Sequence, residues 1–166
     1  MPLPLTDPSS PPTANVALVR DLYAAYLERD VERLFPMLHP DVELLGEPGE
    51  GDETIVVHGR EDLPRYQEQR DREYDVVRER VSEILDLGDG RVLAIGRILL
   101  AAPGQRRGFS SLFSWVLDIE GGVVTRVCGY VDQEEARAAV GLSEGAWPDT
   151  ERYLGDLADG GAASRA

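Results

Sequence analysis

The stretch RGFSSLFSWVLDIEGGVVTRVCGYVD, residues 107–132, predicts a long β-hairpin that ends directly at the start of a helix. Gly121 and Gly122 form the turn, and the flanking runs are rich in Val, Ile, Phe, Trp and Thr, which suit a pleated surface. Asp132 follows as an N-cap for a short helix, QEEARAAV, which Gly141 ends. The rest of the chain can be placed relative to this hairpin.

Two further long strands precede the hairpin, at about residues 76–87 and 91–102, and the turn LGDG joins them. Four antiparallel strands in sequence result. The strand at 91–102 is apolar on both sides: Val92, Ala94, Ile98 and Leu100 lie on one face, and Leu93, Ile95 and Leu99 lie on the other. Such a strand needs cover on both faces. We expect helices on one face and a second sheet or another subunit on the other.

The first half of the chain predicts those helices. Apolar residues recur at helical spacing over 15–30, VERLFPMLH at 31–39 continues as a second short helix, and a third helix spans 60–75. DVELLG at 41–46 and TIVVHG at 54–59 read as short strands. The prediction is an α+β fold, with one curved antiparallel sheet wrapped on about three N-terminal helices.

One domain of residues 15–142 is expected between two tails. Residues 1–14 contain five prolines, which resist both helix and sheet, and predict a disordered tail. Residues 143–166 end in a low-complexity run and predict a flexible tail, in which residues around Trp147 provide enough apolar side chains for one more docked turn.

The charge pattern narrows the class of partner. The 166 residues hold 31 acidic side chains against 17 basic ones, a net charge of −14, and every basic residue is arginine. This balance argues against nucleic acid and anionic membranes as partners. No apolar run is long enough to span a membrane, and the first residues do not resemble a secretory signal, so a cytoplasmic location is expected.

No cofactor or metal is expected. The single cysteine, Cys128, lies in an apolar strand run and is interpreted as a small core residue, and His39 and His58 do not have the spacing of metal ligands. The absence of lysine also excludes Schiff-base chemistry.

Three segments carry a family resemblance: LERDVERLFPMLHPDVEL at 27–44, HGREDLPRY at 58–66, and FSWVLDIEGGVVTRVCGYVDQEEARAAVGL at 113–142. Together they resemble the nuclear transport factor 2-like superfamily and, within it, the SnoaL-like (polyketide cyclase-like) proteins. The resemblance covers about residues 15–142. It implies a cone-shaped fold with an internal apolar pocket, and a homodimer formed through the outer face of the sheet, which a monomer measured by light scattering would contradict.

The same resemblance implies where catalytic groups would lie, and this sequence departs from the ketosteroid isomerase pattern there. The position of the carboxylate base at the end of the first strand falls on Gly46, next to Glu47, and the position of the helix tyrosine falls on Leu22. Asp132 is the acid near the late strands that a SnoaL-type cyclase would use, although a role as helix N-cap is the favoured explanation for it. Glu47 and Asp132 are therefore the catalytic candidates.

Ligand-binding candidates come from the hairpin and its neighbours. Alternation places Phe113, Trp115 and Leu117 on one face, and we expect Arg126, Cys128 and Tyr130 of the second strand to share it. A buried arginine must be paired or face a ligand, which draws attention to Arg97. The predicted pocket lining is Tyr26, Arg97, Trp115, Arg126 and Tyr130.

Two functions stay open from the sequence. The first is an isomerase, cyclase or hydrolase that acts by general acid/base catalysis on an apolar carbonyl or acid-bearing substrate. The second is a non-catalytic module of the same fold that binds a small apolar molecule or dimerises, which the departures at the catalytic positions favour.

Overall fold

The computed structural model describes residues 12–45, 55–74, 76–104 and 109–148. Its elements follow one another as α1 (Ala14–Leu27), α2 (Val31–Leu34), η1 (Phe35–Met37), β1 (Leu38–Leu45), β2 (Ile55–His58), η2 (Arg60–Asp62), α3 (Leu63–Glu73), β3 (Val76–Asp86), β4 (Arg91–Ala101), β5 (Phe109–Glu120), β6 (Val123–Tyr130), α4 (Gln133–Val140) and η3 (Glu144–Ala146). The predicted α+β class is confirmed. None of the helices in these ranges has the length and apolar character that crossing a membrane requires.

The six strands form one mixed sheet with the order β2-β1-β6-β5-β4-β3. The four strands from β3 to β6 are antiparallel in sequence, and the hairpin of β5 and β6 turns at Gly121 and Gly122 as predicted. The sequence did not predict how β1 joins the sheet. It lies parallel to β6, with Leu44 opposite Val127, and extends the sheet at the far side of the hairpin.

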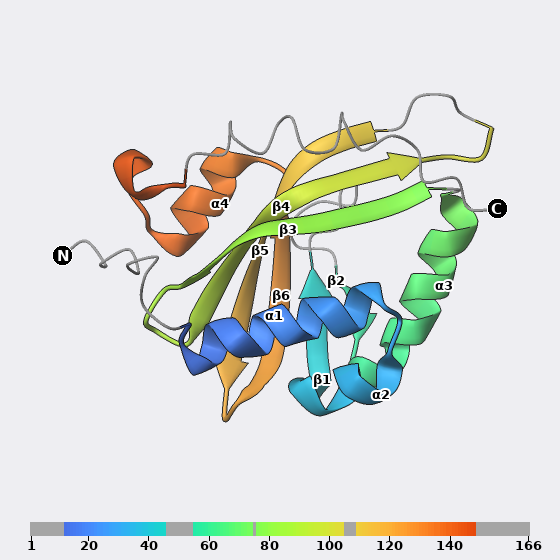
Figure 1. Cartoon of the computed structure of the whole chain (residues 1–166), viewed down its shortest axis with the longest axis horizontal. Coiled ribbons are helices and arrows are strands. Elements are labelled where there is room, and N and C mark those ends of the chain that lie inside the picture. The colour runs from blue at the N-terminus through green and yellow to red at the C-terminus, as the bar shows by residue number, and fades with distance from the viewer. Residues whose placement is uncertain (1–11, 46–54, 75, 105–108, 149–166) are drawn as a thin grey trace.

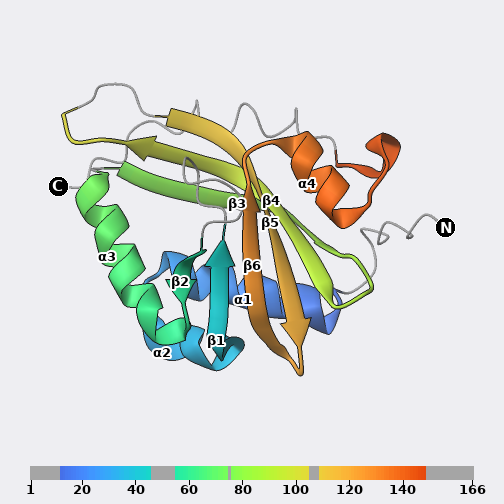
Figure 2. The ribbon, with the colours of Figure 1, turned by 180° about the vertical axis from the view of Figure 1, so that it is seen from behind.

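The two faces of the sheet are covered by different helices. We call the face that bears Val92, Ala94 and Ile98 the inner face, and α1 and α3 pack there in the main hydrophobic core. Figure 1 shows α1 crossing this face, and Figure 2, from behind, shows β1, β5 and β6 in front of α1. The opposite, outer face bears Leu93 and Ile95 in a second, smaller core.

The outer face has a cover that the sequence did not predict. Val140 of α4 and the half-buried Trp147 after η3 pack against Leu93, Ile95 and Val116. The expectation that only a second sheet or another subunit could cover these residues is therefore wrong, because the helix after the hairpin folds back onto β4 and β5. A homodimer through the remainder of this face stays a prediction.

The second predicted helix is shorter than expected. It ends at Leu34 and continues as the 3-10 turn η1, in which Pro36 lies, and β1 already begins at Leu38. Pro36 has no backbone N–H for a continuing α-helix, which explains the early end. Leu38 and His39, the last two residues of the predicted helix over 31–39, therefore belong to β1.

Gly96 of β4 lies where the backbone of β3 and the ring of Phe113 on β5 approach most closely. Gly96 of β4 lies opposite Val81, at an irregularity in β3 between Val81 and Glu83, and opposite Phe113 on its other side. A Cβ at position 96 would overlap the backbone carbonyl of Arg80 and lie 2.9 Å from Cζ of Phe113. A glycine in a strand commonly marks such a close approach, and a bulge increases local bending. Gly96 thus lets the sheet curve around the inner core.

Gly96→Ala is expected to lower the free energy of unfolding by about 1 to 3 kcal/mol, because the added methyl group meets backbone that cannot move away without distorting the bend. Urea denaturation followed by circular dichroism would measure it. Gly145→Ala is the matched control, since a Cβ there meets no atom within 4 Å. Equal stabilities of the two variants would show that the bend does not require glycine.

Candidate functional site

A cavity of about 70 Å³ lies inside the inner face, between the sheet and the helices α1, α2 and α3. This volume has room for several water molecules or a small organic group. Its walls are mainly aliphatic and aromatic, and the lining residues are Leu22, Tyr23, Tyr26, Leu34, Leu38, Val42, Leu44, Val57, Leu63, Glu79, Trp115, Leu117 and Val127. Such a space favours an apolar molecule.

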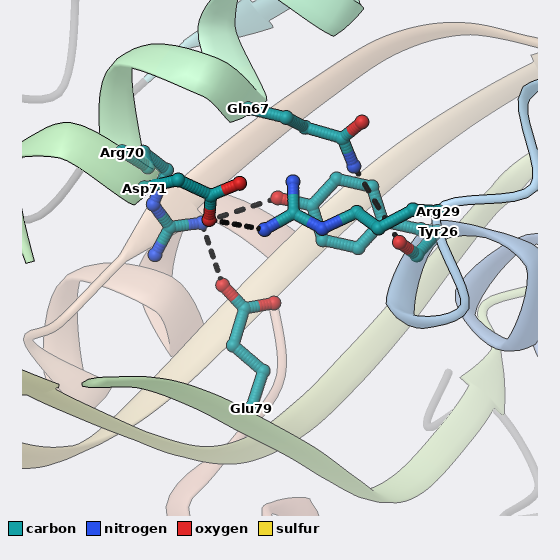
Figure 3. A network of polar contacts seen from close by, with 6 residues as sticks. All are labelled: Tyr26, Arg29, Gln67, Arg70, Asp71 and Glu79. Atoms are coloured by element: carbon teal, nitrogen blue, oxygen red, sulfur yellow. Dashed lines mark hydrogen bonds and ion pairs between the residues drawn. The ribbon is translucent and has the colours of Figure 1, made fainter. Parts of the chain in front are cut away.

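One charged group borders this apolar space. Glu79 of β3 has a side chain only 3% exposed, and its carboxylate accepts a hydrogen bond from Nη1 of Arg70 on α3 at 2.8 Å. Arg70 is equally buried, and the same Nη1 donates to the hydroxyl oxygen of Tyr26 on α1 at 3.1 Å. Figure 3 shows Arg70 reaching both partners, and the three residues come from three different elements.

Local sequence explains how this polar group is held in place. On α3, Leu63, Tyr66, Gln67 and Arg70 are spaced so that all four lie on the buried side of the helix. The guanidinium carbon of Arg70 lies 5.7 Å from the ring centroid of Tyr66, and Gln67 donates to the backbone carbonyl of Tyr26. At the exposed edge, Arg29 and Asp71 form a further ion pair between the end of α1 and α3.

Tyr23 lies next to this group on α1 and also borders the cavity. Its burial, and secondarily the negative charge of Glu79, raise the pKa of its hydroxyl well above the ordinary value of 10.0. The phenol therefore stays protonated at physiological pH and can only donate or accept a hydrogen bond as a neutral group.

Trp115 of β5 supplies a hydrogen-bond donor without a partner. Its side chain is buried, its ring packs edge-on against Phe113 with centroids 5.8 Å apart, and its Nε1–H has no acceptor among the residues that the structure describes. A buried indole N–H normally has a partner, and leaving one unmade is unfavourable. Trp115 lines the cavity, so a molecule placed there can supply the acceptor once the ring turns its buried N–H toward that space.

The structure brings two of the predicted lining residues, Tyr26 and Trp115, to this cavity. It places the others elsewhere. In the register of the hairpin, Trp115 lies opposite Gly129, whereas Tyr130 lies opposite Ser114 and Arg126 opposite Asp118.

Paired residues of antiparallel strands share a face, so Arg126, Cys128 and Tyr130 lie on the outer face. The prediction that they share a face with Trp115 is wrong, because it assumed a register shifted by one residue. They border a shallow outer pocket with Arg91, Val116, Asp118 and Ala139, and Cys128 is half-buried there.

Arg97 also lies on the outer face. It is opposite Arg80 on one side and Leu112 on the other, and its Nη2 donates to Oγ of Ser110 at 3.0 Å. It does not line the cavity, although the prediction placed it there. The prediction that Arg97 shares a face with Ile95 is confirmed by the register. The assignment of that face to the pocket is wrong.

Of the two catalytic candidates, Asp132 is not among the residues that line the cavity. Asp132 is the N-cap of α4, and its carboxylate accepts hydrogen bonds from the backbone N–H groups of Glu134 at 2.8 Å and Glu135 at 3.1 Å. Capping accounts for its position. Glu47 lies outside the described residues.

Comparison with known proteins supports the fold and leaves the chemistry open. No protein-family model matches the sequence, and no curated protein matches it. Solved structures do match. An NTF2-like protein of unknown function from Burkholderia pseudomallei K96243 is 20% identical, with a TM-score of 0.62 over 78% of this chain and 98% of its own. The chain has the nuclear transport factor 2-like fold.

Two other proteins with similar structures were solved with small molecules. TerC, co-crystallised with polyporic acid, is 18% identical, with a TM-score of 0.62 over 78% of this chain and 99% of its own. A protein with a ketosteroid isomerase-like fold from Catenulispora acidiphila DSM 44928, in complex with trimethylamine, is 16% identical, with a TM-score of 0.58 over 79% of this chain and 97% of its own. The TM-scores of these comparisons establish the nuclear transport factor 2-like fold, while a place in the SnoaL-like branch stays a prediction.

Sequence reasoning missed Glu79 and Arg70 in this nuclear transport factor 2-like cavity, although signals were present. Glu79 alternates with Val77 and Val81 in the run VVRERV, which indicates the apolar face of the strand. Arg70 follows Leu63, Tyr66 and Gln67 at helical spacing. A charge at an apolar position on each of two elements indicates a buried pair.

Over the described ranges, no group of three or more His, Cys, Asp or Glu residues is placed to hold a metal ion.

Arg70→Met is expected to lower the free energy of unfolding by about 3 to 5 kcal/mol, because it leaves the buried carboxylate of Glu79 without its cation. Adding Glu79→Leu should restore more than half of the loss, since the double variant removes both charges. Urea denaturation would measure both effects.

The matched control for this pair is Arg29→Met, which breaks the exposed pair with Asp71, whose side chains are 41% and 55% exposed. Exposed pairs contribute about 1 kcal/mol or less. An Arg70→Met variant as stable as the Arg29→Met variant would contradict the structural role of the buried pair.

Proposed function

We propose that the protein binds a small, mainly apolar molecule in the inner cavity, and that this molecule bears a hydrogen-bond acceptor which meets Nε1 of Trp115. The observation that carries the proposal is the buried N–H of Trp115, which has no acceptor among the described residues and belongs to a side chain that lines the cavity. A carbonyl or ether oxygen would complete its hydrogen bonding. The aliphatic walls account for the apolar body of the ligand.

The comparisons agree with a binding role. TerC with polyporic acid and the Catenulispora acidiphila protein with trimethylamine are proteins of this fold that were solved with small molecules. The ligands differ in chemistry, so the fold alone does not indicate which molecule this chain takes. The residues of its own cavity must decide that.

Binding without catalysis is better supported than general acid/base chemistry. Glu79 is the carboxylate that borders the cavity among the described residues, and Arg70 holds it at 2.8 Å. One oxygen of this carboxylate is already engaged by the guanidinium group of Arg70, so the contact accounts for Glu79 as a structural partner of α3. Tyr23, whose pKa is raised, is a correspondingly weak acid. An isomerase, cyclase or hydrolase of the SnoaL-like type would need a further group to act on the ligand.

The test compares acetophenone with α-methylstyrene. The second probe has nearly the same shape but carries a methylene group in place of the carbonyl oxygen. The preference for the ketone should fall by about fivefold in Trp115→Phe, because phenylalanine keeps an aromatic ring and lacks the donor. Calorimetric titration would measure the four affinities. An unchanged preference would contradict the role of Trp115, and the absence of binding by either probe to the unsubstituted protein would contradict a site for such ligands.

A further inference from the structure

A groove of about 330 Å³ runs between α1 and β3, outside the inner cavity. The lining residues from both elements are Arg20, Tyr23, Leu27, Glu79, Arg80, Val81, Ser82 and Ile84. Tyr23 and Glu79 also line the cavity. These two side chains therefore form the boundary between the two spaces, and we call them the neck.

The position of β3 explains why the groove lies open to solvent. It is the last strand of the sheet on this side, and its pairing with β4 is interrupted between Val81 and Glu83. Tyr23 reaches this edge from the buried side of α1, while Leu27 is exposed one turn further along. The shared lining residues place the groove and the cavity on either side of Tyr23 and Glu79 at this edge.

The groove and the cavity differ in charge. Arg20 of α1 lines the groove and is exposed to solvent. Arg20 makes no hydrogen bond or ion pair with the part of the chain that the structure describes. The negative charge of Glu79 at the neck is neutralised in part by Arg70 at 2.8 Å, so Glu79 repels an anion less than an unpaired carboxylate would. In a chain with a net charge of −14, this is a local site suited to a negative group.

We infer that the groove is the second half of the ligand site, and that the ligand is amphiphilic, with an apolar body in the cavity and a carboxylate in the groove beside Arg20. This inference rests on the proposed binding in the cavity and adds the class of ligand. The neck then contacts the middle of the ligand. Guanidinium groups bind carboxylates through paired N–H donors, and their strength here is limited by exposure to water.

The experiment uses unbranched carboxylates from hexanoate to dodecanoate and the corresponding neutral amides, titrated by calorimetry into the full chain. We expect the carboxylates to bind more tightly than the amides of the same length. Arg20→Gln should weaken the carboxylates by about threefold to fivefold and leave the amides unchanged. Arg126→Gln is the matched control, because it removes an exposed arginine from the outer face, and it should change neither series.

The outcomes separate the two claims. If amides and carboxylates bind equally to the unsubstituted protein, or if Arg20→Gln and Arg126→Gln have the same effect, the groove has no role while binding in the cavity stands. If neither series binds, both the cavity site and its extension into the groove are overturned. A loss of carboxylate affinity confined to Arg20→Gln supports the amphiphilic ligand.

Discussion

The buried ion pair between Arg70 and Glu79 is the contact that ties the helices to the sheet around the cavity. Arg70 comes from α3, Glu79 from β3, and Tyr26, which shares the same guanidinium nitrogen, from α1. Burying two charges is unfavourable unless each is paired and hydrogen-bonded, so the three elements are held at one relative position. The apolar cavity lies beside this pair, and its shape depends on the pair being intact.

The bend of the sheet supplies the space that the ion pair borders. Gly96 and the irregularity in β3 allow the strands to curve, so that Trp115 on β5 and Tyr23 on α1 line one cavity. The same irregular edge strand leaves the groove beside Arg20 open. The cavity is mainly apolar, the neck holds the phenol of Tyr23 and the paired carboxylate of Glu79, and the groove holds Arg20. These neighbouring environments match an amphiphilic ligand better than a wholly apolar one.

The fold could largely be predicted from local patterns, whereas the site could not. Alternating and helical apolar spacing placed the hairpin, the strand with two apolar faces and the helices, because each depends on residues near in sequence. The faces of Arg126 and Tyr130 were assigned wrongly because they depend on register, and one residue of slip exchanges the two faces. The cover by α4 and the parallel pairing of β1 with β6 depend on contacts distant in sequence. The sequence shows Glu79 and Arg70 as charged residues at apolar positions of a strand and a helix. Only the structure shows that they pair with each other.

The most direct test of ligand binding in the inner cavity is the indole region of a nitrogen-proton correlation spectrum during titration with acetophenone. The two tryptophans of the chain give two indole signals, and Trp147→Phe assigns them. We predict that the Nε1–H signal of Trp115 moves downfield as its hydrogen bond to the carbonyl forms, while that of Trp147, on the outer face, stays in place. A Trp115 signal that does not move at a saturating concentration of the ketone, or equal movement of both signals, would contradict the account.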